Sequence, residues 1–376
     1  MTGRHRTFST KTAAFTAVLT TVVAAGIALL VIVSGRGEPA TSADAGTAHT
    51  PPSLVQKLHP DAACHEVRVP VSVKEMGNAH IYGELCRPRH RSTTSKTVQL
   101  LVPGSTYNHS YYDMPVAHGR YSYVSSALDA GFSTFNVDRL ATGRSTLPPS
   151  SKYTLAAGTD ALHQVVTQLR DGQIMDRTFD KVVWVGHSLG SSMAWAQAAK
   201  YPRDVDAFVL TSMSHVVREE EPSGDGPGQD IQFEIKAKDD PKFRGSINDS
   251  GYLTTNAGMR QFFYDTAHTD PAVIKADERL KDVSTAADSD ITPLPPAKSP
   301  SRAIKVPTLL VTGDKDQYCT VGTCTSKTML AGERPYYSDQ AGLTSIVVPN
   351  SGHNVQLHKN APETNAKILN WIKTTS

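Results

Sequence analysis

The sequence predicts an α/β fold in which helices cover both faces of a mostly parallel β-sheet. Short apolar runs alternate with amphipathic segments over most of the chain, as in successive strand–helix units. Several of these runs contain no alternating polar residues, which is typical of strands buried on both faces. The chain has 376 residues, of which 39% are hydrophobic and 20% are charged, so it can bury a full core.

The expected elements follow in chain order. Residues 67–73 alternate between apolar and polar side chains, which predicts a half-buried strand, and residues 80–86 form its expected hairpin partner. The later apolar runs predict strands at 98–102, 132–137, 181–185, 205–210, 306–311 and 344–348. The amphipathic segments predict helices at 121–130, 155–169, 188–200 and 361–372.

The alternation breaks between residues 215 and 301, where the chain is polar and contains many turn residues. Two helices are expected there, at 256–267 and 271–281. This block is predicted to be a cap inserted between two strands of the sheet. Such an insertion lies above the carboxyl ends of the strands, where open α/β sheets bind ligands. Residues 61–376 are therefore expected to form one folded domain with a cap at about 215–301.

Residues 1–34 are expected to form a signal or membrane anchor. Within them, residues 13–33 are apolar and uncharged, follow a basic start, and are long enough to span a bilayer. A cleavable signal peptide is an alternative, because residues 43–45 have the small-x-small form, and a buried helix is another. Residues 35–60 have the composition of a flexible linker. The rest of the chain is expected to be extracytoplasmic, either membrane-anchored or secreted.

The four cysteines fit an exported protein. An even number in such a chain predicts two disulfides, for which three pairings are possible. Cys64–Cys86 and Cys319–Cys324 are favoured, because each pair is close in sequence. On the chain-entropy model, the first bond is expected to stabilise the fold by roughly 3 kcal/mol, because it closes a loop in the unfolded chain. The cysteine and histidine spacings do not match a zinc site, so no metal is expected.

A Gly-x-Ser-x-Gly motif at residues 186–190 lies between an expected strand and an expected helix. In this context the motif is typical of a nucleophile elbow, a sharp turn that exposes a strained serine. Small neighbours are needed in such a turn, and Gly186 and Gly190 provide them. Ser188 is therefore the candidate nucleophile. The alternative interpretation is a tight turn with a purely structural role.

A serine nucleophile needs a base, and the base needs a carboxylate that orients it. His353 follows the last expected strand and is the candidate base. Asp316 is the preferred acid and Asp314 the alternative, because both follow the preceding strand. The order Ser188, Asp316, His353 is one that this kind of site uses. Asp138, which follows another strand, is interpreted as organising its loop.

An oxyanion hole needs two N–H donors. The first expected donor is the backbone of Leu189, directly after the nucleophile. The second is the backbone of Ser105, in the turn that follows the expected strand at residues 98–102.

These motifs resemble those of the α/β-hydrolase superfamily, and the resemblance extends from about residue 61 to the end of the chain. Residues 186–190, 313–316 and 352–353 correspond to its nucleophile, acid and base motifs. Residues 103–113 (PGSTYNHSYYD) resemble the oxyanion segment of actinobacterial secreted or membrane-anchored serine hydrolases. The sequence departs from the superfamily at Pro103, where His is frequent, and at Ser191, where Gly is frequent.

The expected activity is hydrolysis of a small-molecule or lipid-like carboxylic ester through an acyl-enzyme. Peptidase, thioesterase or acyltransferase chemistry with the same residues is an alternative, and a non-catalytic binding protein is another. The sequence contains no phosphate loop, dinucleotide fingerprint or metal-ligand cluster, so no cofactor is expected. The net charge of +2 gives no indication of nucleic-acid binding. Aromatic residues of the cap, namely Tyr252, Phe262, Phe263 and Tyr264, are candidates for the lining of an acyl pocket.

Overall fold

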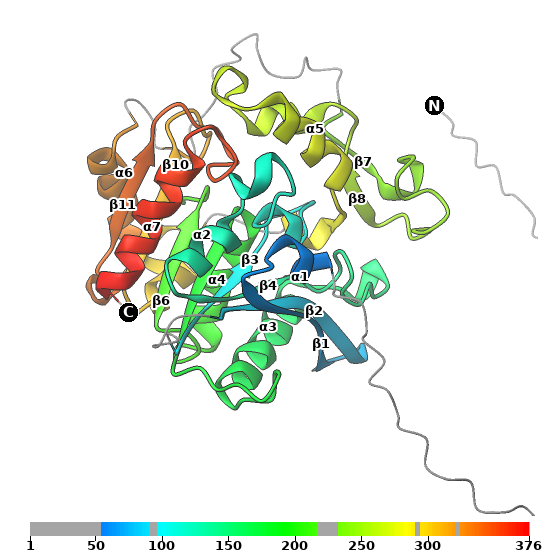
Figure 1. Ribbon diagram of the computed structural model, residues 1–376, viewed down its shortest axis with the longest axis horizontal. Coiled ribbons are helices and arrows are strands. Elements are labelled where there is room, and N and C mark those ends of the chain that lie inside the picture. The colour runs from blue at the N-terminus through cyan, green and yellow to red at the C-terminus, as the bar shows by residue number, and fades with distance from the viewer. Residues whose placement is uncertain (1–53, 90–95, 217–231, 290–293, 320–323, 376) are drawn as a thin grey trace, which may run out of the picture. The chain divides into compact units, whose positions relative to one another are not determined.

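The computed structural model describes residues 54–89, 96–216, 232–289, 294–319 and 324–375 (Figure 1). The expected N-terminal signal or anchor at 1–34 and most of the linker at 35–60 lie outside these residues. Within the described residues, no helix is both long enough and apolar enough to cross a bilayer.

An eight-stranded sheet forms the centre of the domain, with the order β1-β2-β4-β3-β5-β6-β10-β11. Strands β1 and β2 form an antiparallel hairpin, β2 is antiparallel to β4, and every later pairing is parallel. The strand bounds are Ala62–Val73 (β1), Gly77–Pro88 (β2), Thr97–Val102 (β3), Ser133–Val137 (β4), Lys181–His187 (β5), Ala207–Thr211 (β6), Thr308–Gly313 (β10) and Thr344–Val348 (β11). The predicted α/β fold with a mostly parallel sheet is confirmed.

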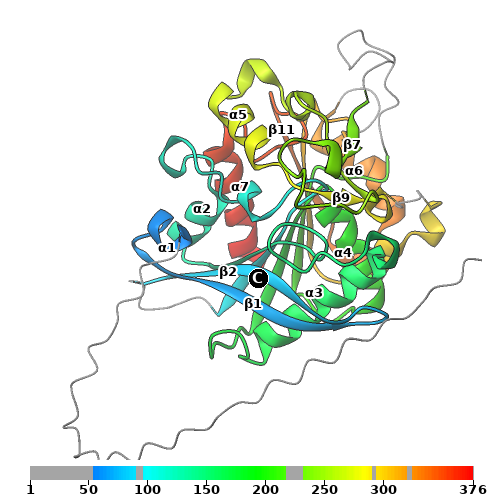
Figure 2. The same ribbon diagram turned by 90° about the vertical axis from the view of Figure 1, so that its right-hand side faces the viewer.

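Helices pack on both faces of this sheet (Figure 2). Side chains alternate across each strand, so neighbouring strand residues belong to different halves of the core. In β5, Val182 and Trp184 pack on the side of α3 (Leu155–Arg170) and α4 (Leu189–Lys200). Val183 and Val185 pack on the side of α2 (Tyr123–Asp129) and α7 (Ala361–Thr375). The remaining helices of the main domain are α1 (Leu54–Leu58) and α6 (Ser326–Glu333).

Between β6 and β10, the described residues form a small antiparallel sheet in the order β7-β8-β9 and the α-helix α5 (Pro271–Leu280). The bounds of its strands are Glu234–Lys236 (β7), Tyr252–Thr255 (β8) and Ser284–Thr285 (β9). We call residues 232–289, which contain this sheet and helix, the cap.

The prediction of a helix at residues 256–267 is wrong. Two short 3₁₀ segments, Met259–Phe263 and Thr266–His268, occupy this stretch. Gly258 before them has a left-handed φ of 80°, and Tyr264 between them is extended, so helical hydrogen bonding cannot continue. The next helix, α5, begins at Pro271, and the Asp270 side chain caps it by accepting a hydrogen bond from the N–H of Ala272.

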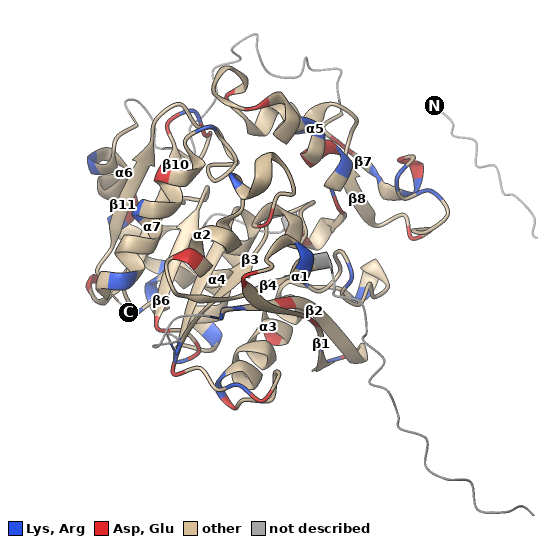
Figure 3. Cartoon of the chain, in the orientation of Figure 1, with Lys and Arg blue, Asp and Glu red and all other residues tan. Residues whose placement is uncertain are grey.

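Both favoured disulfides are present. Cys64 and Cys86 are directly opposite each other in the β1–β2 hairpin, and Cys319–Cys324 closes the loop after β10. Disulfides persist in oxidising compartments, so the two bonds indicate an extracytoplasmic location for the domain. Charges of both signs are interspersed along the described elements (Figure 3).

Candidate active site

The turn between β5 and α4 holds Ser188 in a strained conformation. Its φ and ψ are 50° and −115°, and its N–H donates to the carbonyl of Thr211 over 2.9 Å. A non-glycine residue with such angles costs about 1–3 kcal/mol and persists only when its surroundings impose it. A Cβ atom on Gly190 would lie 2.1 Å from the carbonyl oxygen of Val102, and one on Gly186 would lie 2.5 Å from that of Gly190. The turn therefore requires both glycines of the motif.

The loop after β11 brings His353 to a carboxylate. Its Nδ1 lies 3.1 Å from Oδ1 and 3.3 Å from Oδ2 of Asp316. Asp316 is 1% exposed and His353 is 9% exposed. Asp314 has a different contact: its Oδ1 accepts a hydrogen bond from the N–H of Ser351 over 3.3 Å. Of the two candidate acids, the structure pairs Asp316 with the imidazole, whereas Asp314 supports the backbone of the histidine loop.

The two candidate oxyanion donors lie on either side of Ser188. Leu189 is the first residue of α4, and Ser105 is in a turn that the N–H of Tyr107 closes on the carbonyl of Gly104 over 3.3 Å. Within the described part of the chain, neither backbone N–H has a hydrogen-bond partner. The turn lies so close to the serine that a Cβ on Gly104 would be 3.0 Å from the Cβ of Ser188.

A cavity of about 610 Å³ connects these groups. Ser188, His353, Leu189 and Ser105 all line it. Its other walls come largely from apolar and aromatic side chains of the domain and of the cap, including Leu155, Trp195, Met213, Phe233, Phe263 and Tyr318. A predominantly apolar pocket with a few convergent polar groups is typical of small-molecule sites.

Two carboxylates also line the cavity, and they differ in their contacts. Asp288 forms an ion pair with Arg139 at 3.2 Å and accepts a hydrogen bond from the Tyr153 hydroxyl over 3.0 Å. Glu234, by contrast, forms no side-chain hydrogen bond or ion pair with the described residues. Burial, with a smaller contribution from the Asp288 charge, raises the pKa of Glu234 above its ordinary value. Of these two carboxylates, Glu234 is therefore the one that no described cation neutralises, and the described lining contains no Lys or Arg.

The aromatic residues expected to line the pocket are only partly found there. Phe263 lies in the lining. The Tyr252 hydroxyl instead donates to the carbonyl of Pro148, and the Tyr264 hydroxyl donates to Asp277. Phe262 is 37% exposed.

Two other residues near the site have structural contacts. The Asp138 carboxylate accepts hydrogen bonds from the N–H groups of His109 and Arg144, both over 2.7 Å, so it organises its own loop. The His187 ring stacks on Tyr111 with a centroid separation of 3.9 Å, and its Nε2 donates to the carbonyl of His353 over 3.3 Å. Burial, together with the charge of His353, lowers the pKa of His187 well below its ordinary value, so the ring is neutral.

Comparison with known proteins identifies the family of this chain. The model of the alpha/beta hydrolase family matches residues 99–365, which is most of the chain. The chain belongs to the alpha/beta hydrolase family. The resemblance that the motifs indicated is confirmed, and the protein is a hydrolase. No curated protein matches the sequence.

Solved structures share the fold of this family member at low sequence identity. An esterase from Thermogutta terrifontis has 18% identity and a TM-score of 0.54, over 82% of this chain and 99% of its own. Naproxen esterase from Bacillus subtilis has 14% identity and a TM-score of 0.51, over 84% and 94%. The enol-lactonase from Burkholderia xenovorans LB400 has 14% identity and a TM-score of 0.51, over 81% and 99%.

The sequence analysis missed a second histidine, His358, which supports the loop of the candidate base His353. The Nε2 atom of His358 accepts hydrogen bonds from the N–H groups of Gly352 and Asp265, both over 3.0 Å. Its Nδ1 donates to the carbonyl of Asn354 over 3.0 Å. Only a neutral imidazole can accept at Nε2. His358 lies five residues after His353, and the sequence does not indicate its role. Its partners are backbone groups, which every residue has, so no motif marks them.

We expect His358 to make the stability of the protein depend on pH. Burial lowers its pKa from 6.5 to about 4. A group with a depressed folded-state pKa is protonated first in the unfolded chain, so the free energy of unfolding falls as the pH drops from about 6.5 towards 4. At pH 4, His358 alone is expected to have lowered the free energy of unfolding by about 3 kcal/mol relative to pH 7. Urea unfolding at pH 7 and pH 4 measures it.

Carboxylates titrate in the same range, so the control is the same pair of measurements on His358→Gln. This variant is expected to be less stable than wild type at pH 7. Its free energy of unfolding should fall by about 3 kcal/mol less than that of wild type when the pH drops from 7 to 4. Equal losses in both proteins would contradict the assignment.

Proposed function

We propose that this hydrolase cleaves carboxylic esters through an acyl-enzyme intermediate. The Oγ of Ser188 attacks the ester carbonyl while His353 takes its proton, and Asp316 orients the imidazole and stabilises its cationic form. The N–H groups of Leu189 and Ser105 donate to the oxyanion. His353 then protonates the departing alcohol. Water, deprotonated by the same imidazole, releases the acid and restores Ser188.

The observation that carries the proposal is that Ser188 and the His353 of a histidine–aspartate pair line one cavity. Ser188 has the strained φ of a nucleophile elbow, and His353, hydrogen-bonded to Asp316, lines the same cavity. A buried histidine–carboxylate pair that lines the same cavity as a serine is the arrangement that serine activation needs. The apolar walls of the cavity favour a small-molecule or lipid-like ester over a charged substrate. Peptidase, thioesterase and acyltransferase activities use the same groups and are outcomes of the test below.

The disulfides and the sequence of the N-terminal segment support a location outside the cytoplasmic membrane. We propose that residues 1–34 direct export, with the domain anchored or released beyond residues 35–60.

The proposal is tested by labelling and by a substrate screen. A fluorophosphonate probe is expected to label the intact protein at Ser188. Among p-nitrophenyl esters of increasing chain length, aminoacyl anilides and thioesters, we expect the neutral acyl esters to be cleaved fastest. An acyl chain ending in a carboxylate is expected to be a poorer substrate, because Glu234 lines the cavity and the described lining contains no Lys or Arg that would pair with the substrate carboxylate.

Two results would change this conclusion. Strong anilide turnover without ester turnover would show a peptidase. The absence of both labelling and turnover would favour a non-catalytic protein on this fold.

A further inference from the structure

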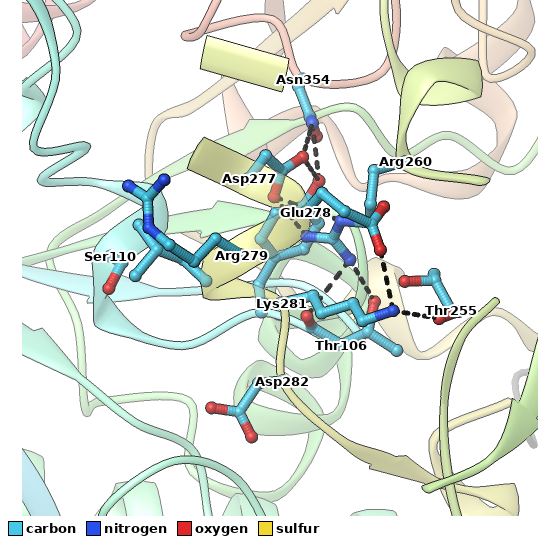
Figure 4. A network of polar contacts seen from close by, with 12 residues as sticks. Thr106, Ser110, Thr255, Arg260, Asp277, Glu278, Arg279, Lys281, Asp282 and Asn354 are labelled. Carbon is cyan, nitrogen blue, oxygen red and sulfur yellow. Dashed lines mark hydrogen bonds and ion pairs between the residues drawn. The ribbon is translucent and has the colours of Figure 1, made fainter. Parts of the chain in front are cut away.

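Arg260 of the cap is fully buried, and it contacts Thr106 and Tyr107, two residues that line the cavity. One of its terminal nitrogens, Nη1, donates to the Oγ1 of Thr106 over 2.8 Å and to the Thr106 carbonyl over 3.3 Å. Its Nε and Nη2 donate to Oδ1 of Asp277, over 3.2 and 2.6 Å (Figure 4). The guanidinium also stacks over the Tyr107 ring at 3.8 Å. The donors of this cation are therefore engaged by Asp277 and by the turn that carries Ser105.

That turn is strained at Thr106. The residue has a φ of 57°, a conformation that β-branched side chains rarely adopt. It occupies the third position of the Gly104–Tyr107 turn, where glycine or asparagine is preferred when φ is positive. The cost of such a residue is about 1–3 kcal/mol, so its neighbours must hold it.

The groups that hold Thr106 come from the cap. Besides Arg260, the N–H of Asp282 donates to the Thr106 carbonyl over 2.8 Å. The other end of the turn is held from the main domain, where Arg139 donates to the carbonyl of Gly104 over 3.1 Å. The peptide of Ser105 is thus fixed between two buried arginines.

Asp277 extends the contact to the loop of the base. Its Oδ2 accepts hydrogen bonds from the hydroxyls of Tyr264 and Tyr107, over 2.7 and 3.0 Å, and from Nδ2 of Asn354 over 3.3 Å. The Asn354 amide also donates to the Tyr107 hydroxyl over 2.6 Å. Asn354 directly follows His353. The Arg260–Asp277 pair therefore bridges the turn of the proposed oxyanion donor and the loop of the proposed base.

We propose that Arg260 is a positioning residue that holds the N–H of Ser105 in the geometry for oxyanion binding, with Asp277 joining this turn to the loop of His353. The inference rests on the proposed function and goes beyond it, because it makes the cap part of the catalytic apparatus. A buried ion pair is weak support for stability, since removal of two charges from water offsets most of their attraction. The specific contribution of Arg260 is its planar set of donors, which can bind the Thr106 carbonyl and the Asp277 carboxylate at the same time.

The test compares Arg260→Met and Arg260→Lys with the matched control Lys281→Met. Lys281 is also buried in the same part of the chain and forms ion pairs with Asp240 at 2.9 Å and with Glu278 at 2.8 Å. It donates to the carbonyl of Thr255, not to the turn of Ser105 or the loop of His353. With the best ester of the screen, Arg260→Met is expected to lower kcat by about 10- to 100-fold with little change in KM. Arg260→Lys, which keeps the charge but not the planar donors, is expected to lie between Arg260→Met and wild type, whereas Lys281→Met keeps kcat within about threefold.

A rescue experiment separates positioning from a loss of folding. Adding Thr106→Gly to Arg260→Met removes the steric reason for the strain, so the turn no longer needs the clamp. The double variant is expected to recover kcat to within about fivefold of wild type. Thermal unfolding of each variant shows whether the fold is intact, and if Arg260→Met does not fold, Arg260→Lys with and without Thr106→Gly gives the same comparison.

Equal losses of kcat in Arg260→Met and Lys281→Met, or no recovery in the double variant, would overturn the positioning role. Fluorophosphonate labelling keeps this outcome separate from failure of the proposed function. If wild-type Ser188 takes no label, the proposed function fails. If wild type and Arg260→Met are labelled at equal rates, only the positioning role fails.

Discussion

Replacement of Ser188 with alanine is expected to lower kcat by about 10⁴- to 10⁶-fold and to abolish fluorophosphonate labelling. Alanine cannot form the acyl-enzyme, and no other hydroxyl occupies the strained position between β5 and α4. The residual rate would come from substrate binding and from the oxyanion donors acting on a water molecule. Steady-state kinetics with the best ester, together with mass analysis of the labelled protein, measures both effects.

Ser191 provides the matched control for Ser188. It is fully buried in the first turn of α4, and its Oγ donates to the carbonyl of Thr211 over 2.9 Å. Ser191→Ala should cost about 1 kcal/mol of stability through the lost hydrogen bond and leave kcat within a few-fold. If Ser188→Ala retained more than a tenth of the wild-type kcat, Ser188 would not be the nucleophile.

Replacement of Asp316 with asparagine is expected to lower kcat by about 10⁴-fold, with a small change in KM. The carboxylate stabilises the imidazolium that forms when His353 takes the serine proton, and it holds the proton on Nδ1 so that Nε2 faces the substrate. An amide is uncharged and can itself donate to Nδ1, which would favour the wrong tautomer. Steady-state kinetics with the best ester of the screen measures the loss, and thermal unfolding shows that the fold is intact.

Asp314→Asn is the control for this substitution, because the two aspartates are separated by one residue. The Asp314 carboxylate touches the N–H of Ser351 and not the imidazole, so its replacement should change kcat by only a few-fold. If Asp314→Asn reduced kcat as strongly as Asp316→Asn, the pairing of His353 with Asp316 would not be the catalytic one.

Much of the fold could be predicted because its patterns are local. The apolar runs of β3 and β5 and the amphipathic pattern of α3 follow from burial on one or two faces. The elbow around Ser188 could also be predicted, since its glycines are required by contacts within the turn and with the adjacent strand. The cap was predicted less well: its small sheet was missed, and Gly258 interrupts a segment whose composition favours a helix.

The sequence by itself determined the fold class, the candidate nucleophile and the candidate base, because each depends on a periodic pattern or on a short motif next to a strand. Only the tertiary structure decided which aspartate contacts His353, because both candidates occupy the same loop and differ only in the direction of their side chains. It also decided the role of Arg260, whose partners Thr106 and Asp277 come from distant parts of the chain. Buried polar contacts of this kind depend on distance and angle in three dimensions, and a linear pattern does not encode them.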